Sequence, residues 1–129
     1  MTLAETSFDL ADLCDSMADE ITTARSAVGY TESLGQGATL DHSVSSLRDE
    51  ADAMRTAGVA ASLESADAAI AQLNDATSQA NDAVSKLKEA NEMITVAGSL
   101  LVLAAAAATG NILGIATGAA ALVSEVKEL

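Results

Sequence analysis

The side chains best suited to chemistry are few in this chain, and their spacing does not bring them together. His42 is the only histidine and Cys14 the only cysteine among the 129 residues. His42 stands beside Asp41 near the start of an expected helix, without a second histidine or a cysteine for a metal site and without a nucleophile at a recognisable spacing. We therefore expect a solvated histidine at a helix end.

Carboxylates are plentiful, but their spacing follows a helix surface. Asp9, Asp12, Asp15 and Asp19 recur every three or four residues, which places them on the solvated side of one helix. The chain lacks the Glu-x-x-His pairs of di-iron bundles, and also the glycine and terminal glutamate of a calcium loop. The sequence therefore predicts no enzyme activity, no metal site and no cofactor.

Cys14 lies at an apolar helical position beside Leu10, Leu13 and Met17, so we expect a buried, unreactive thiol. A lone cysteine forms no disulfide within the chain and says little about the compartment. The N-terminal sequence MTLAETSFDL is acidic and lacks the basic and apolar regions of a secretory signal. Three locations stay open: at a membrane, secreted without such a signal, or cytoplasmic.

The net charge of −13 limits the partners. Residues 1–92 carry 17 acidic and 5 basic side chains, so nearly all of this charge lies there. Nucleic acids and anionic lipid headgroups bind Lys and Arg, and such a surface repels them. The only aromatic residues, Phe8 and Tyr30, are too few to line a drug-sized pocket. We expect neither a nucleic acid nor a small-molecule substrate as partner.

The elements that must position these residues are helical in pattern. A capping box at Thr2-Leu3-Ala4-Glu5, followed by apolar residues in steps of three and four, predicts a helix over 3–28. Three glycines in 29–40 predict the main loop, and Asp41 is expected to cap a second helix over 41–57. With no proline in the chain, long helices are permitted.

A third helix is predicted over 59–96, continuing to about Ala108, because its apolar and small residues keep a heptad pattern for five heptads. At about 57 Å, the segment 59–96 exceeds what a compact bundle needs, so we expect an elongated hairpin or an oligomer. Asn91, within the pattern, either fixes register or is tolerated near a helix end. The heptad seam consists of Val59, Leu63, Ala66, Ile70, Leu73, Thr77, Ala80, Val84, Leu87, Asn91 and Ile94.

The chain is free of charge from Met93 to Ser124. As a helix, residues 97–123 would be about 40 Å long, enough to span a hydrocarbon core of about 30 Å once. Four glycines, Asn111 and several hydroxyl residues oppose insertion, so this segment either inserts marginally or packs as a buried helix. Its strongly apolar residues are Leu100, Leu101, Val102, Leu103, Ile112, Leu113, Ile115, Leu122 and Val123.

Gly110, Gly114 and Gly118 recur every four residues in this segment. On a continuous helix they form one smooth helix-association face, a glycine zipper. The competing prediction is a break at 109–111, where Gly110 ends one helix and Asn111 caps the next.

The layout, an acidic helical hairpin followed by a small-residue hydrophobic segment, resembles three unrelated groups. These are helical pore-forming toxins, small secreted helical-hairpin proteins and tail-anchored coiled-coil proteins. The Trp-x-Gly turn of the second group is missing, because the chain contains no tryptophan. No motif selects one group.

Together these patterns predict an all-α fold: an elongated helical hairpin or bundle with a long heptad-patterned helix and a hydrophobic Gly/Ala-rich C-terminal helix. We expect an acidic body at 1–96, the hydrophobic segment at 97–123 and a short charged tail at 124–129. The expected function is a self-assembling protein that associates with or inserts into a membrane through 97–123, as a pore-forming component or a tail-anchored subunit.

The alternative is a soluble oligomeric helical-bundle subunit, with an interaction, structural or secretion-related role, whose apolar segment is buried at a helix–helix interface. Under either hypothesis, the partner is a second copy or another helical protein.

Overall fold

Helix α1 begins where the capping box predicts. In the computed structural model, which describes residues 2–129, the Thr2 hydroxyl accepts a hydrogen bond from the Glu5 amide at 3.1 Å. The Glu5 carboxylate accepts in return from the Thr2 amide at 3.4 Å. These bonds satisfy amide groups that have no partner within the first turn of a helix.

The described residues form an all-α bundle without strands. Its five α-helices are α1 (Leu3–Arg25), α2 (Gln36–Thr56), α3 (Asp67–Ala83), α4 (Ala90–Thr109) and α5 (Ile112–Lys127). Two short 3-10 turns, η1 (Ala61–Leu63) and η2 (Val84–Lys86), flank α3.

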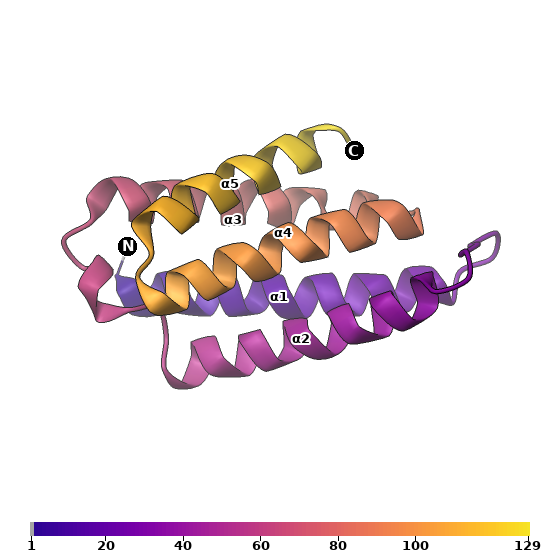
Figure 1. Ribbon diagram of the computed structural model, residues 1–129, viewed down its shortest axis with the longest axis horizontal. Helices are drawn as coiled ribbons and strands as arrows, with labels where there is room; N and C mark the ends of the chain where they lie inside the picture. Colours follow the sequence, from indigo (N-terminus) through magenta and orange to yellow (C-terminus); the bar gives the residue numbers. More distant parts are fainter. Residues whose placement is uncertain (1) are drawn as a thin grey trace.

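The helices run lengthwise beside one another (Figure 1). Helices α1 and α2 form one antiparallel pair, and α4 and α5 form another, with α4 also packed on α2 and α5 also packed on α3. The α4–α5 turn lies at the same end of the bundle as the start of α1. The bundle therefore consists of two helical hairpins, joined through α3.

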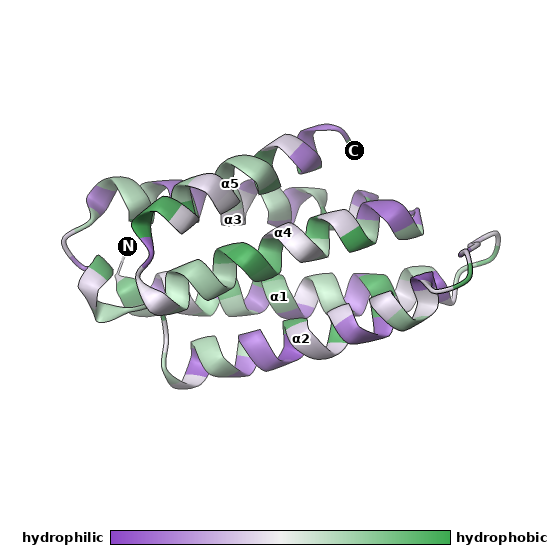
Figure 2. Cartoon of the chain, viewed as in Figure 1, coloured by the Kyte–Doolittle hydropathy of each residue, from purple (hydrophilic) through white to green (hydrophobic). Residues whose placement is uncertain are grey.

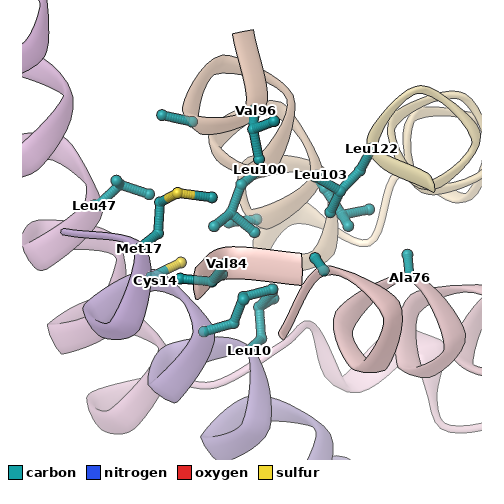
Figure 3. Packing of buried hydrophobic residues seen from close by; sticks show 14 of the residues in the cluster. Leu10, Cys14, Met17, Leu47, Ala76, Val84, Val96, Leu100, Leu103 and Leu122 are labelled. Carbon is teal, nitrogen blue, oxygen red and sulfur yellow. The ribbon is translucent and has the colours of Figure 1, made fainter. Parts of the chain in front are cut away.

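The core lies where all five helices meet, and its residues are aliphatic (Figure 3). Met17 of α1 lies near Leu47 of α2 and Leu100 of α4, and Leu122 of α5 lies beside Leu103 of α4. Alanines complete the core and let the helices approach closely. Cys14 is buried among these side chains, as the sequence predicts.

The prediction of one long helix over 59–96 is wrong, since the chain turns twice in this region. Helix α3 ends at Ala83, and Leu87 takes an extended conformation with φ −68° and ψ 125°. Helix α4 begins after Glu89, where the Glu92 carboxylate accepts from the Glu89 amide at 3.2 Å. Because α4 folds back along the bundle, the molecule is compact and not an elongated hairpin.

The first loop is shorter than predicted and lies earlier. Helix α1 ends at Arg25 instead of residue 28, and α2 begins at Gln36. The N-cap of α2 is Gly35, at φ 89°, and not Asp41, which lies inside α2. The Arg25 guanidinium binds both Glu32 and Asp41, and this ties the end of α1 to the loop and to α2.

Candidate interaction surface

The inward side of residues 97–123 belongs to the core. Leu100, Leu103, Ile115 and Leu122 have no exposed surface. Leu101 and Val123 are partly buried and pack against the same cluster. Six of the nine strongly apolar residues that suggested a membrane segment are therefore wholly or partly buried inside the bundle.

The break at 109–111 is present, and it divides the predicted glycine face. Gly110 follows the last residue of α4 in the left-handed conformation, with φ 73°, and the Asn111 side chain accepts from the Gly114 amide at 2.9 Å. Gly110 therefore lies in a turn near Ser62 and does not continue a helical face with the other glycines.

Gly114 and Gly118 allow α5 to approach α4 closely. A Cβ atom at Gly118 would lie 3.3 Å from the Leu103 Cα atom. At Gly114, a Cβ atom would lie 3.0 Å from the Ala106 Cβ atom. The close approach that these glycines permit is thus made within the chain, between α5 and α4.

The outward side of the same two helices carries apolar side chains that nothing in the bundle covers. Val102 is 60%, Ile112 54% and Leu113 77% exposed. We define the charge-free surface as the exposed residues of α4, α5 and the turn between them, from Thr95 to Ser124. It consists of Thr95, Gly98, Val102, Ala105, Ala108, Thr109, Asn111, Ile112, Leu113, Thr117, Ala120, Ala121 and Ser124.

The α4–α5 hairpin is also more hydrophobic than α2 (Figure 2). Hydrophobic colours dominate α4 and the first turns of α5, whereas α2 shows many hydrophilic residues. The exposed positions Thr95, Gly98, Val102, Ala105 and Thr109 are spaced by three and four residues, so they share the outer side of α4. The spacing of these residues is visible in the sequence, but apolar residues lie on both sides of α4, so composition alone did not show which side faces outward.

Glu125 borders the charge-free surface where α5 ends. The Ser99 hydroxyl of α4 donates to Glu125 Oε1 at 2.7 Å. Glu125 Oε2 is buried, and no group among residues 2–129 hydrogen-bonds to it. The carboxylates Glu92 and Glu125 are the first charges beyond this surface along α4 and α5, both at the end away from the α4–α5 turn.

Most heptad-seam residues face the core, although they do not lie on one helix. The buried ones are Val59, Leu63, Leu73, Thr77, Ala80, Val84 and Leu87, while Ala66, Ile70 and Ile94 are partly buried. Asn91 is exposed, and its side-chain oxygen accepts from Gln36 Nε2 of α2 at 2.7 Å. Asn91 thus joins α4 to α2 within the chain.

Helix α4 is the one helix within residues 2–129 whose length and apolar composition would let it cross a membrane. In its most apolar window, 44% of the residues are buried inside the bundle. Core helices of soluble proteins have the same properties, so this observation is weak evidence for a membrane span.

Helices α1 and α2 present the opposite kind of surface. The Arg55 guanidinium lies 2.9 Å from Asp12 and 2.6 Å from Asp15, and Arg48 lies 3.0 Å from Asp19. Hydrogen bonds from Arg55 to Asp12 and then Asp15 raise the pKa of that guanidinium. Three of the four aspartates in the acidic stripe of α1, Asp12, Asp15 and Asp19, are therefore paired with arginines of α2.

A polar hollow of about 490 Å³ lies between the α1–α2 loop and the start of α4. Tyr30, Glu32, Gln36 and Asn91 are among its lining residues. Their polar groups bond to one another: Tyr30 donates to Glu32 at 2.6 Å, and Gln36 bonds to Asn91. The hollow thus holds a satisfied network.

The residues considered first for chemistry stay apart in the fold. His42 is exposed on α2, and its nearest polar side-chain partner is Ser46 at 3.5 Å. Burial raises the pKa of the Cys14 thiol to about 12. Within residues 2–129, no group of three or more His, Cys, Asp and Glu side chains is placed to hold a metal ion.

Comparisons with known proteins do not connect these features to a family. No protein-family model, curated protein or solved structure matches the chain. The charge-free surface is therefore the feature from which a function is best inferred.

Proposed function

We propose that this chain is a helical-bundle interaction module that docks through the charge-free surface of α4 and α5. The observation that carries this proposal is the contrast in charge. In a chain of net charge −13, the exposed residues from Thr95 to Ser124 are all uncharged, and they include the apolar side chains of Val102, Ile112 and Leu113.

Such a surface suits the centre of a protein interface. Interface cores are depleted of charged residues, because burying an unpaired charge is costly. Each large apolar side chain contributes about 1.5–3 kcal/mol when it passes fully from water into a packed environment. The inward residues of the same helices hold the bundle together, so docking requires no rearrangement of the core.

Two solution measurements test this proposal. The full chain, without detergent, should stay in solution as a single copy or a small defined oligomer by light scattering. It should also remain in the supernatant when zwitterionic phosphatidylcholine vesicles are sedimented. Sedimentation of the folded chain with the vesicles would contradict the proposal.

Membrane insertion of the α4–α5 hairpin is the second candidate, favoured by the length of α4. Its 20 residues extend about 30 Å, which matches a hydrocarbon core. The 16 residues of α5 extend only about 24 Å. Insertion would require Leu100, Leu103 and Leu122 to leave the core, so this function needs a trigger that opens the bundle. Dye release from the same vesicles would favour it.

A further inference from the structure

We infer that the occupant of the charge-free surface is a second copy of this chain, and that the two copies pair through α4 and α5 in antiparallel orientation. This inference rests on the proposed function and names its partner. A symmetric pair brings the same surface of both copies together, so an uncharged surface meets an uncharged surface of equal extent.

The distribution of charge over the molecule favours a second copy as the partner. Two copies of net charge −13 repel each other, and the surface without carboxylates is where close approach costs least. A basic partner would gain most at the acidic outer sides of α1 and α2. It would gain nothing from a surface on which no residue between Met93 and Ser124 is charged.

Charge also selects the orientation. The carboxylates that border the surface, Glu92 and Glu125, both lie at the end away from the α4–α5 turn. Parallel pairing would bring these two carboxylates of one copy next to the same two carboxylates of the other, at an end that also carries Lys88 and Lys127. Antiparallel pairing instead places these two carboxylates beside the uncharged α4–α5 turn of the other copy, around Ile112 and Leu113. The dipoles of the two α4 helices also oppose one another in this arrangement.

The size of the surface predicts the strength of the pair. Helix α4, about 30 Å long, and helix α5, about 24 Å long, are each about 10 Å across and together present about 540 Å² per copy. Stable interfaces of standard size bury about 600–1,000 Å² per partner, so this surface lies just below that range. We therefore expect a reversible dimer with a dissociation constant in the micromolar range, and not an obligate one.

The first experiment is sedimentation equilibrium of the full chain from about 1 to 500 µM, a range that brackets a micromolar dissociation constant. The expected result is a shift from one copy to two with concentration. Val102→Asp and Leu113→Asp should each weaken pairing about tenfold or more, because each buries an unpaired carboxylate at the interface. Val28→Asp is the matched control: it makes the same change at a fully exposed residue outside this surface, and it should change the dissociation constant less than about twofold.

Circular dichroism establishes that each variant is folded. Asparagine has nearly the shape of aspartate but no charge, so Val102→Asn should weaken pairing less than Val102→Asp. Added salt should partly restore pairing of the aspartate variant and not of the asparagine variant. Dissociation by Val28→Asp but not by the surface variants would overturn the assignment of this surface.

Disulfide cross-linking tests the orientation. Val102 is the midpoint of the outer stripe from Thr95 to Thr109, so in an antiparallel pair it meets its own counterpart. Val102→Cys should form a disulfide-linked dimer on mild oxidation, whereas Thr95→Cys should not, because a disulfide requires Cα atoms within about 7 Å. Buried Cys14 should remain reduced. Equal cross-linking at both positions would indicate parallel pairing and overturn the antiparallel orientation.

The failure of this inference and the failure of the proposed function give different results. A chain that stays a single copy to about 500 µM and leaves vesicles unbound overturns the second-copy partner, while the docking role stands. A chain that sediments with vesicles overturns the docking role, and the dimer with it.

Discussion

The two helical hairpins of this protein bury similar aliphatic side chains, but their outer surfaces are opposite in kind. Across α1 and α2, Arg48 and Arg55 join carboxylates of the facing helix. Across α4 and α5, the polar side-chain contact is the Ser99–Glu125 hydrogen bond, and the helices pack on each other through Gly114 and Gly118. The shared core explains why both hairpins fold, and the difference between their outer surfaces is the basis for proposing that α4 and α5 form the docking surface.

The difference also predicts which hairpin tolerates mutation. Ion pairs between exposed groups typically contribute about 0–1 kcal/mol, because water screens them and their side chains lose entropy. By contrast, a glycine packed closely against the backbone of a neighbouring helix leaves no space for a larger side chain. We therefore expect α4 and α5 to be sensitive at their contact and α1 and α2 to tolerate the loss of individual ion pairs.

The largest effect is expected at the inward side of α4. Leu100→Ala should lower the free energy of unfolding by about 2–5 kcal/mol, because it leaves a cavity at a fully buried position. Val102→Ala, two residues away and mostly exposed, should change it by less than about 1 kcal/mol. Urea unfolding followed by circular dichroism measures both. Equal losses would mean that α4 does not have the described inward and outward sides.

The two glycines Gly118 and Gly98 offer the next test. Gly118→Leu should cost about 1–3 kcal/mol through overpacking, since its new Cβ atom would press on the Leu103 backbone. Gly98→Leu makes the same change where a Cβ atom meets nothing within 4 Å, and it should stabilise the single copy by about 0.5–1 kcal/mol through helix propensity. Urea unfolding at low protein concentration compares them. A stabilising Gly118→Leu would show that α4 and α5 are not in close contact there.

A smaller effect is expected across α1 and α2. Arg55→Met removes the ion pairs with Asp12 and Asp15 and should destabilise the protein only slightly at low salt. The loss should shrink as salt shortens the screening length from about 10 Å at 0.1 M to about 3 Å at 1 M. Thermal or urea unfolding at both salt concentrations measures it, with Lys127→Met as a control for net charge. A loss that ignores salt would point to packing of the Arg55 side chain instead.

The smallest effect concerns the loop between α1 and α2. Hydrogen bonds from Tyr30 and then Arg25 lower the pKa of Glu32 below its ordinary value of 4.5. Its stabilising contribution is therefore present above pH 4.5 and is lost as the pH falls through the lowered pKa. Glu32→Gln should slightly destabilise the protein at pH 7 and have a smaller effect near pH 2, as measured by urea unfolding at the two values. An equal difference at both values would contradict this pKa direction.

Local signals in the sequence predicted several features correctly. The capping box at Thr2 and Glu5 placed the start of α1, and Gly110 with Asn111 placed the turn between α4 and α5. Each signal depends on hydrogen bonds or backbone angles within a few residues, so no distant contact is needed to read it. The burial of Cys14 followed in the same way from its helical stripe.

The turn between α3 and α4 was missed for a physical reason. Neither glycine nor proline marks residues 84–89, and the heptad pattern continues through them. Because α3 and α4 both bury residues at heptad spacing against one core, the pattern fits two antiparallel helices as well as one long helix. The local signal that could have revealed the turn is the Glu89–Glu92 pair at the start of α4.

The sequence by itself determined that the chain is helical, that most of its acidic residues precede a charge-free segment, and which residues of that segment are apolar. Only the tertiary structure decided which apolar side chains are covered. The hydrophobic effect is not directional, so composition does not specify what covers a given residue. That depends on contacts far apart in sequence, such as Val59 donating to Ser7 at 2.9 Å and Ala60 donating to the Ala107 carbonyl at 3.0 Å. These contacts bring the chain before α3 against α1 and α4, and the folded bundle leaves Val102 and Leu113 exposed.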